Sequence, residues 1–109
     1  MRGRGFLDDA RYAEAFARDR VRLSPRGTRR VVQELRGRGV DPEVATEAME
    51  GVLREEGIDD LDLAREAARK WRPRAGEERE RARRRLAGFL ARRGFGSEAV
   101  RTVVEELGL

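Results

Sequence analysis

Apolar residues recur along the chain at the spacing of helix faces, with little sign of the strict alternation that marks a β-strand. Tyr12, Ala13, Phe16 and Ala17 have the i, i+1, i+4, i+5 spacing of one helical face. The apolar faces expected for the next two helices are Val31, Val32 and Leu35, followed by Val44, Ala45, Ala48, Met49, Val52 and Leu53. The pattern predicts an all-α protein.

Capping residues predict where the first three helices begin. Asp8 or Asp9 is expected to cap a first helix that runs to about Arg22. Ser24-Pro25 and Asp41-Pro42 each place a capping side chain before a proline, which predicts the starts of the second and third helices. The second helix is expected to stop at the glycines between positions 37 and 39.

The second half of the chain has similar punctuation. An aspartate among positions 59, 60 and 62 is expected to open a fourth helix that ends near Trp71 and Pro73. A long arginine-rich helix is expected from about Gly76 to Arg93, and Ser97 is expected to cap the last helix. Six helices are therefore predicted.

The two halves are copies of one unit. The stretches VVQELRGRGVDPEVATEAM and LAGFLARRGFGSEAVRTVV align without a gap at an offset of 55, with Leu35 on Leu90 and Gly39 on Gly94. The first helices match at an offset of 51, so the second copy has four extra residues around RPRAGEER. We predict tandem three-helix units over residues 1–56 and 57–109, forming an elongated, curved molecule with limited contact between the units.

The composition argues against catalysis. The chain has 109 residues and contains neither cysteine nor histidine, which removes thiolate nucleophiles, imidazole bases and the common zinc ligands. Asp8 and Asp9 stand where a helix begins, and the further oxygen ligands of a calcium loop do not follow them, so they are interpreted as caps. We therefore expect that the chain is not an enzyme and that it binds neither a metal ion nor a cofactor. No apolar run is long enough for a membrane span or a signal peptide, so a cytoplasmic protein is expected.

Charge alternates in blocks along the chain. Residues 1–40 carry a net charge of +6, residues 41–68 of −8, residues 69–93 of +8 and residues 94–109 of −2. Lys70 is the only lysine among 25 basic residues, and arginine suits phosphate and carboxylate partners. A GC-rich genome would produce the same arginine bias.

The candidates for contact with a polyanion or an acidic protein are arginines on the first two helices of the first unit and on the second helix of the second unit. They are Arg11, Arg18, Arg22, Arg26, Arg29, Arg30, Arg36, Arg38, Arg79, Arg83, Arg84, Arg85, Arg92 and Arg93. The alternative is a solvated face balanced by glutamates one turn away, such as Glu14 with Arg18 or Glu80 with Arg84. Trp71 and Phe95 fall at apolar positions of the repeat and are interpreted as core residues.

Three stretches together resemble the RecX family. A Leu-Asp-Asp followed by Arg-Tyr-Ala is found between Leu7 and Ala13. A Gly followed by Arg-Val and by Glu-Leu-x-x-x-Gly is found between Gly27 and Gly39, with Val31 where the family has isoleucine. The closing Leu-x-x-Phe-Leu-x-x-Arg-Gly-Phe runs from Leu86 to Phe95.

The resemblance implies tandem three-helix repeats, generally three of them, that bind RecA in its nucleoprotein filament and restrain it. Here residues 1–56 resemble the middle repeat and residues 57–109 the C-terminal one, so either a first repeat has been cut away or this member is short. The resemblance and the charge together lead us to expect RecA as a partner, DNA, single- or double-stranded, bound without sequence preference, no membrane, and a monomeric chain. The alternative function is an arginine-rich helical DNA-binding module without a RecA partner.

Overall fold

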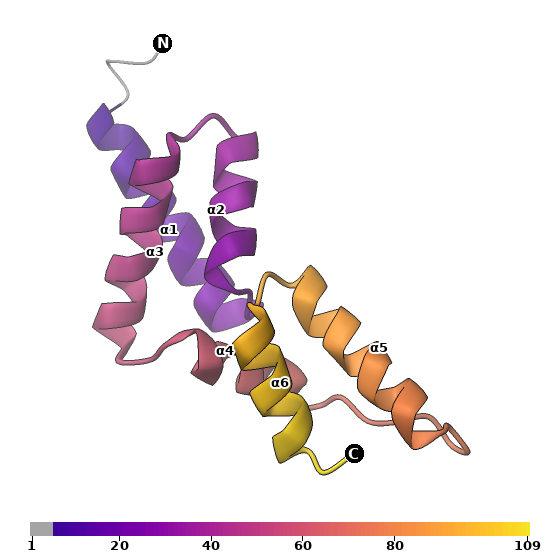
Figure 1. Cartoon of the computed structure of the whole chain (residues 1–109). Coiled ribbons are helices and arrows are strands. Elements are labelled where there is room, and N and C mark those ends of the chain that lie inside the picture. The colour runs from indigo at the N-terminus through magenta and orange to yellow at the C-terminus, as the bar shows by residue number, and fades with distance from the viewer. Residues whose placement is uncertain (1–5) are drawn as a thin grey trace.

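Six α-helices make up the regular structure of the described chain (Figure 1). The structure is a computed structural model that describes residues 6–109, so residues 1–5 of the first predicted unit lie outside it. The helices are α1 Phe6–Leu23, α2 Thr28–Gly37, α3 Pro42–Glu56, α4 Asp60–Ala68, α5 Arg79–Arg92 and α6 Ser97–Glu106. The all-α prediction is confirmed.

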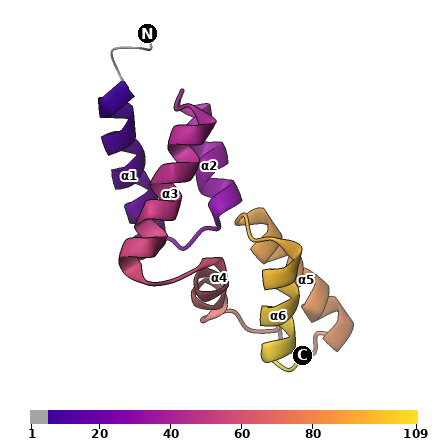
Figure 2. The ribbon, with the colours of Figure 1, turned by 60° about the vertical axis from the view of Figure 1, so that its left-hand side comes forward.

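The helices form two bundles that follow each other along the molecule. Helices α1, α2 and α3 pack on one another, and α4, α5 and α6 do the same (Figure 1, Figure 2). The principal extents of 55 × 26 × 21 Å confirm the predicted elongated shape. None of the described helices is long and apolar enough to cross a lipid bilayer.

Equivalent positions of the two repeats are buried alike. Val31 and Leu86 are fully buried, and so are Leu35 and Leu90, which the repeat alignment pairs. On the first helix of each bundle, the paired Ala13 and Ala64 are both fully buried. Alanine at such positions lets neighbouring helices approach closely, which suits units too small to hold a thick core.

Tyr12 lies at the edge of the apolar face predicted for the first helix. Its side chain is 43% exposed, whereas Phe16, one turn later, is buried. The Tyr12 hydroxyl accepts a hydrogen bond of 3.1 Å from Arg38, so the phenol lies at the edge of the core with its polar end outward.

Two of the predicted caps are confirmed. Asp41 accepts a hydrogen bond of 2.9 Å from the Glu43 backbone N–H, directly before Pro42. Asp59 caps α4 and forms a reciprocal capping box with Asp62. In α1, Asp8 and Asp9 stand in the first turn and not at the cap, because the helix begins at Phe6.

Other predicted boundaries are wrong. The helix α2 begins at Thr28 after Gly27, and not at Ser24-Pro25. Ser97 is the first residue of α6, and the cap position belongs to Gly96. The fourth helix ends at Ala68, before Trp71, and the fifth begins three residues after Gly76. Chain that was predicted as helix is instead used for connections between helices.

The reason for the late start of α2 lies in the second bundle. The Gly27 N–H donates a 2.8 Å hydrogen bond to the Arg93 carbonyl, and the Thr28 N–H donates one of 3.2 Å to the Asp60 carboxylate. The Thr28 hydroxyl also lies 3.1 Å from Asp60. The Asp60 side chain from α4 therefore caps the start of α2, for which Gly27 provides no side chain. We call residues 24–30 and 93–96, which meet here, the junction.

Two glycines allow the main chains to meet at the junction. A Cβ on Gly27 would overlap the Gly94 carbonyl and lie 2.9 Å from the Phe95 ring. Gly94 has a φ of +97°, in the left-handed region that favours glycine. A Cβ added at this position would lie 2.5 Å from the backbone nitrogen of Arg30.

We expect Gly27→Ala to lower the free energy of unfolding by about 1–3 kcal/mol, the usual range for overpacking. Gly37→Ala is the matched control, because nothing lies within 4 Å of its added Cβ and alanine favours the helix. Urea unfolding followed by circular dichroism measures both. Equal stability of the two variants would contradict the close contact.

Candidate partner-binding surface

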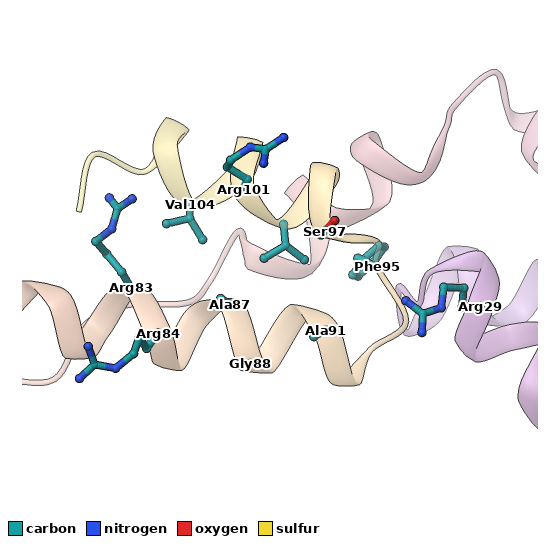
Figure 3. Close-up of a pocket in the computed structure, with 11 residues that line it drawn as sticks. Arg29, Arg83, Arg84, Ala87, Gly88, Ala91, Phe95, Ser97, Arg101 and Val104 are labelled. Atoms are coloured by element: carbon teal, nitrogen blue, oxygen red, sulfur yellow. The ribbon is translucent and has the colours of Figure 1, made fainter.

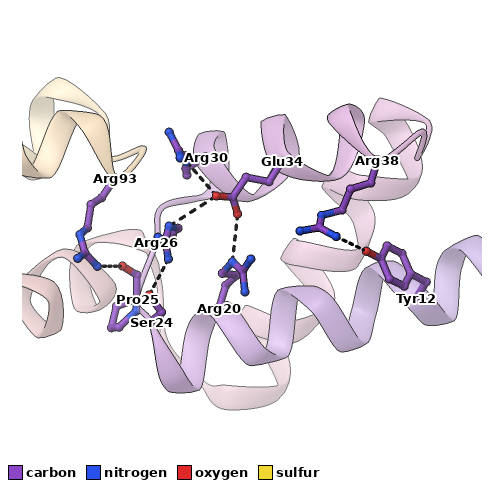
Figure 4. Close-up of polar contacts among 9 residues, drawn as sticks. All are labelled: Tyr12, Arg20, Ser24, Pro25, Arg26, Arg30, Glu34, Arg38 and Arg93. Carbon is purple, nitrogen blue, oxygen red and sulfur yellow. Dashed lines mark hydrogen bonds and ion pairs between the residues drawn. The ribbon is translucent and has the colours of Figure 1, made fainter.

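Glu34 on α2 gathers three arginines (Figure 4). Its carboxylate lies 3.1 Å from Arg20, 3.0 Å from Arg30 and 3.7 Å from Arg26. Desolvation of this 19% exposed side chain acts to raise the pKa of Glu34, but hydrogen bonds from Arg30 and Arg20 outweigh it and lower the pKa. The predicted binding residues Arg26 and Arg30 are thus engaged within the fold, and Arg20 was not predicted.

Two further candidates brace α1 against the end of α3. Arg18 forms an ion pair of 3.1 Å with Glu55, and Arg22 one of 2.7 Å with Glu56. Glu14 is not the ion-pair partner that the helical spacing suggested for Arg18. The carboxylates come from more than thirty residues away, and these exposed contacts reduce the free positive charge of the first bundle.

Arg85 is an internal contact of the second bundle. Its guanidinium donates two hydrogen bonds of 2.9 Å to Glu77 and lies 4.7 Å from the centre of the Trp71 ring. The Glu77 side chain is 4% exposed. Hydrogen bonds from Arg85 and from the Arg74 backbone N–H lower the pKa of Glu77 to about 2. The pair holds the connection before α5 against that helix.

Arg38 and Arg93 lie against aromatic rings. Arg38 stands 4.8 Å from the centre of the Phe16 ring, and Arg93 the same distance from that of Phe89. Arg93 also donates a 3.3 Å hydrogen bond to the Pro25 carbonyl across the junction. Desolvation of the guanidinium lowers the pKa of Arg93, and the positive charge of Arg26 lowers it further. Trp71 and Phe95 pack in or against the core, as predicted.

The other candidates are more available to a partner. Arg11, Arg29, Arg36 and Arg92 are exposed, and the described residues offer none of them an ion pair. Arg84 is exposed and has only a 3.9 Å ion pair with Glu80. The remaining two, Arg79 and Arg83, donate to the backbone oxygens of Gly108 and Leu109.

A groove of about 620 Å³ runs between α5 and α6 (Figure 3). Small or branched apolar side chains form its floor, and four arginines stand around it. The arginines are Arg29, Arg83, Arg84 and Arg101. Arg101 was missed by sequence reasoning, because it is an isolated base in the acidic last block of the chain. Only the packing of α6 beside α5 brings it near the others.

The described surface offers arginine side chains and an apolar groove. Within residues 6–109 no group of three or more acidic, cysteine or histidine side chains is placed to hold a metal ion. Guanidinium groups suit the recognition of anionic partners, and an apolar groove suits the recognition of amphipathic ones.

Comparison with known proteins identifies the family. Residues 8–49 match the second three-helix domain of RecX, and residues 58–104 match the third. The chain belongs to the RecX family. The matched ranges correspond to the two bundles, so the resemblance seen in the sequence motifs is confirmed. The curated relatives carry the name regulatory protein RecX.

Related RecX proteins come from diverse bacteria. The chain is 37% identical to the regulatory protein RecX of Prosthecochloris aestuarii over 101 residues, covering 93% of this chain and 63% of that protein. It is 44% identical to that of Chromohalobacter salexigens over 98 residues, covering 89% and 60%. The chain thus spans less than two thirds of the length of these relatives.

A solved structure has the same fold. The crystal structure of RecX from Lactobacillus salivarius superposes with a TM-score of 0.64 at 23% identity, covering 93% of this chain and 66% of that one. The tandem three-helix architecture is therefore an arrangement that a RecX protein adopts in a crystal.

We expect Glu34→Ala to lower the free energy of unfolding by about 1–3 kcal/mol, because three arginines lose a shared, largely buried acceptor. Glu14→Ala is the matched control, since Glu14 is exposed. Urea denaturation at neutral pH gives both values, and equal midpoints would contradict a structural role for Glu34.

The Glu77 pair predicts loss of stability in acid. Because the folded-state pKa of about 2 lies below the ordinary 4.5, the unfolded chain takes up the proton first as the pH falls. The stabilisation is complete above about pH 4.5 and is lost towards pH 2. The difference in melting temperature between wild type and Glu77→Gln should shrink across this range, as followed by Trp71 fluorescence. Glu78→Gln, an exposed neighbour, is the control, and a constant difference would contradict the prediction.

Proposed function

We propose that this chain binds RecA on its DNA filament and modulates recombinase activity, as part of DNA repair and SOS regulation. The observation that carries the proposal is the ordered match to two RecX domains, over residues 8–49 and 58–104. The curated relatives bear the name regulatory protein RecX. We also propose that the chain acts as a monomer in the cytoplasm, with the boundary between its units at Glu56 and Gly57.

The shape and the charges support this proposal. A rod 55 Å long can contact more than one protomer of a filament. Exposed guanidinium groups on the first bundle, such as Arg11 and Arg36, can meet carboxylates of RecA or phosphates of the DNA. The glycine at position 57 ends α3 in a left-handed conformation with a φ of 71°, which supports a boundary there. Binding of this kind needs no catalytic residue.

Direct DNA binding is the second candidate, favoured by the exposed arginines. An affinity that depended mainly on phosphates would fall steeply with salt, because each contact releases a counterion. The chain has no asparagine and a single glutamine, Gln33, so amide readout of adenine is nearly absent from its surface. DNA contact should therefore show no strong sequence preference.

The deciding experiment is the single-stranded-DNA-dependent ATPase activity of RecA with this chain titrated in. DNA is kept in large excess over the chain, so that sequestration of DNA does not explain a loss. We expect inhibition at concentrations below that of RecA. No inhibition by the folded chain would contradict the proposal, and DNA binding with a steep salt dependence in the same preparation would favour the second candidate.

A pair of charge reversals tests which surface acts. Arg11→Glu with Arg36→Glu should raise the half-maximal inhibitory concentration about tenfold, equivalent to 1.4 kcal/mol of binding free energy. Arg54→Glu with Lys70→Glu is the matched control, because it makes the same charge change at exposed residues outside the candidate set. Equal losses in both variants would indicate an effect of net charge alone.

A further inference from the structure

We propose that the groove between α5 and α6 binds an acidic, amphipathic peptide segment of a partner protein. In this arrangement an apolar side chain of the peptide occupies the floor, and flanking carboxylates pair with the arginines around it. The site is independent of the proposed RecA activity, because it is defined only by the groove.

The floor is open because α5 carries small residues on this side. Ala87, Gly88 and Ala91 line it from α5, and Val100 and Val104 line it from α6. The repeat alignment places Val32, Gln33 and Arg36 of the first bundle at the positions of the three small residues. Longer side chains in the first bundle thus stand where the second bundle leaves apolar space.

The arginines around the groove make it complementary to carboxylates. The residues that line it include four arginines and no acidic residue. Within the described chain Arg29 and Arg101 have no ion pair, and Arg84 has only the 3.9 Å contact with Glu80. Many other arginines of this chain are paired with glutamates. Arg83 donates a hydrogen bond of 2.6 Å to the Leu109 oxygen, so Arg29, Arg84 and Arg101 carry the positive charge that the groove leaves for an external partner.

The apolar floor favours a peptide over a nucleic acid. Single-stranded nucleic acids are held by bases that stack on exposed aromatic faces. Phe95 is the only aromatic residue that lines the groove, and its side chain is 1% exposed. Apart from Ser97 and the four arginines, the remaining lining consists of alanine, glycine and valine, which aliphatic side chains from a partner fit.

The groove reaches across the junction. Arg29 enters its end from α2, whereas Arg83 lies at the opposite end and rises from α5 between the two helices (Figure 3). A peptide that paired with Arg29 would contact both bundles next to the hydrogen bond between Gly27 and Arg93. Binding should consequently stabilise the observed arrangement of the bundles.

The test is fluorescence anisotropy with the full chain and a fluorescein-labelled peptide that repeats Glu-Glu-Leu-Leu. We expect the peptide to bind the wild-type chain. The double variant Arg84→Glu with Arg101→Glu should weaken this binding at least about tenfold. Ala91→Glu should weaken it equally, because it puts a carboxylate on the floor at an exposed position. Arg11→Glu with Arg36→Glu makes the same charge change away from the groove and should bind the peptide normally. Circular dichroism verifies that each variant is folded.

Control ligands separate the alternatives. A peptide with serine in place of each leucine should bind at least about tenfold more weakly, because it lacks the apolar side chains. The proposal is overturned if the two peptides bind equally, or if both arginine pairs weaken binding equally, since charge alone would then account for it. It is also overturned if oligo-dT competes as well as the peptide, or if sedimentation shows that the chain is a dimer and that Ala91→Glu makes it monomeric, since a second copy would then fill the groove. The assay contains no RecA, so its outcome is separate from that of the ATPase experiment.

Discussion

The main-chain contact of Gly27 with Arg93 and Gly94 is the constraint on which the rest of the structure depends. Each three-helix bundle is small, and units of this size bury only a modest share of their surface. The junction compensates by letting one bundle complete the other. Asp60 of α4 satisfies the first N–H of α2, and the Gly27 N–H is satisfied by the Arg93 carbonyl. The start of α2 and the end of α5 therefore each have a hydrogen-bond partner in the other bundle.

The sequence alone predicted what depends on local pattern. Helix number follows from the apolar spacing along each helix, the register of the two repeats from their alignment, and the caps before the third and fourth helices from local sequence; all agree with the structure. The start of α2 does not, because its acceptor is Asp60, thirty-two residues away. Ser24-Pro25 satisfies the local rule for a cap, yet these residues lead into the junction, and Pro25 supplies a carbonyl to Arg93 there. A contact between bundles overrides the local preference.

The candidate surface was predicted less well than the fold. A prediction based on the number of arginines assumes that each one is available to a partner. In the fold, however, Arg22 forms an ion pair with Glu56 and Arg85 forms one with Glu77. Helical spacing finds partners only three or four residues away, whereas Glu56 is 34 residues from Arg22 and Glu77 is 8 residues from Arg85. Arg101 shows the opposite error, since an isolated base gains significance only when α6 packs beside α5. Charge blocks therefore indicated which part of the surface is basic but not which arginines are free.

The junction also fixes a geometric quantity. Because a main-chain hydrogen bond, side-chain hydrogen bonds and two closely approaching glycines join the bundles, the angle between the bundles cannot change without breaking those contacts. A filament repeats its subunits at one rise and one twist. A rod whose two bundles are held in one arrangement would match one such pitch and fit other pitches poorly. Recognition of the RecA filament proposed for this chain would then report the helical state of the polymer as well as its surface charge.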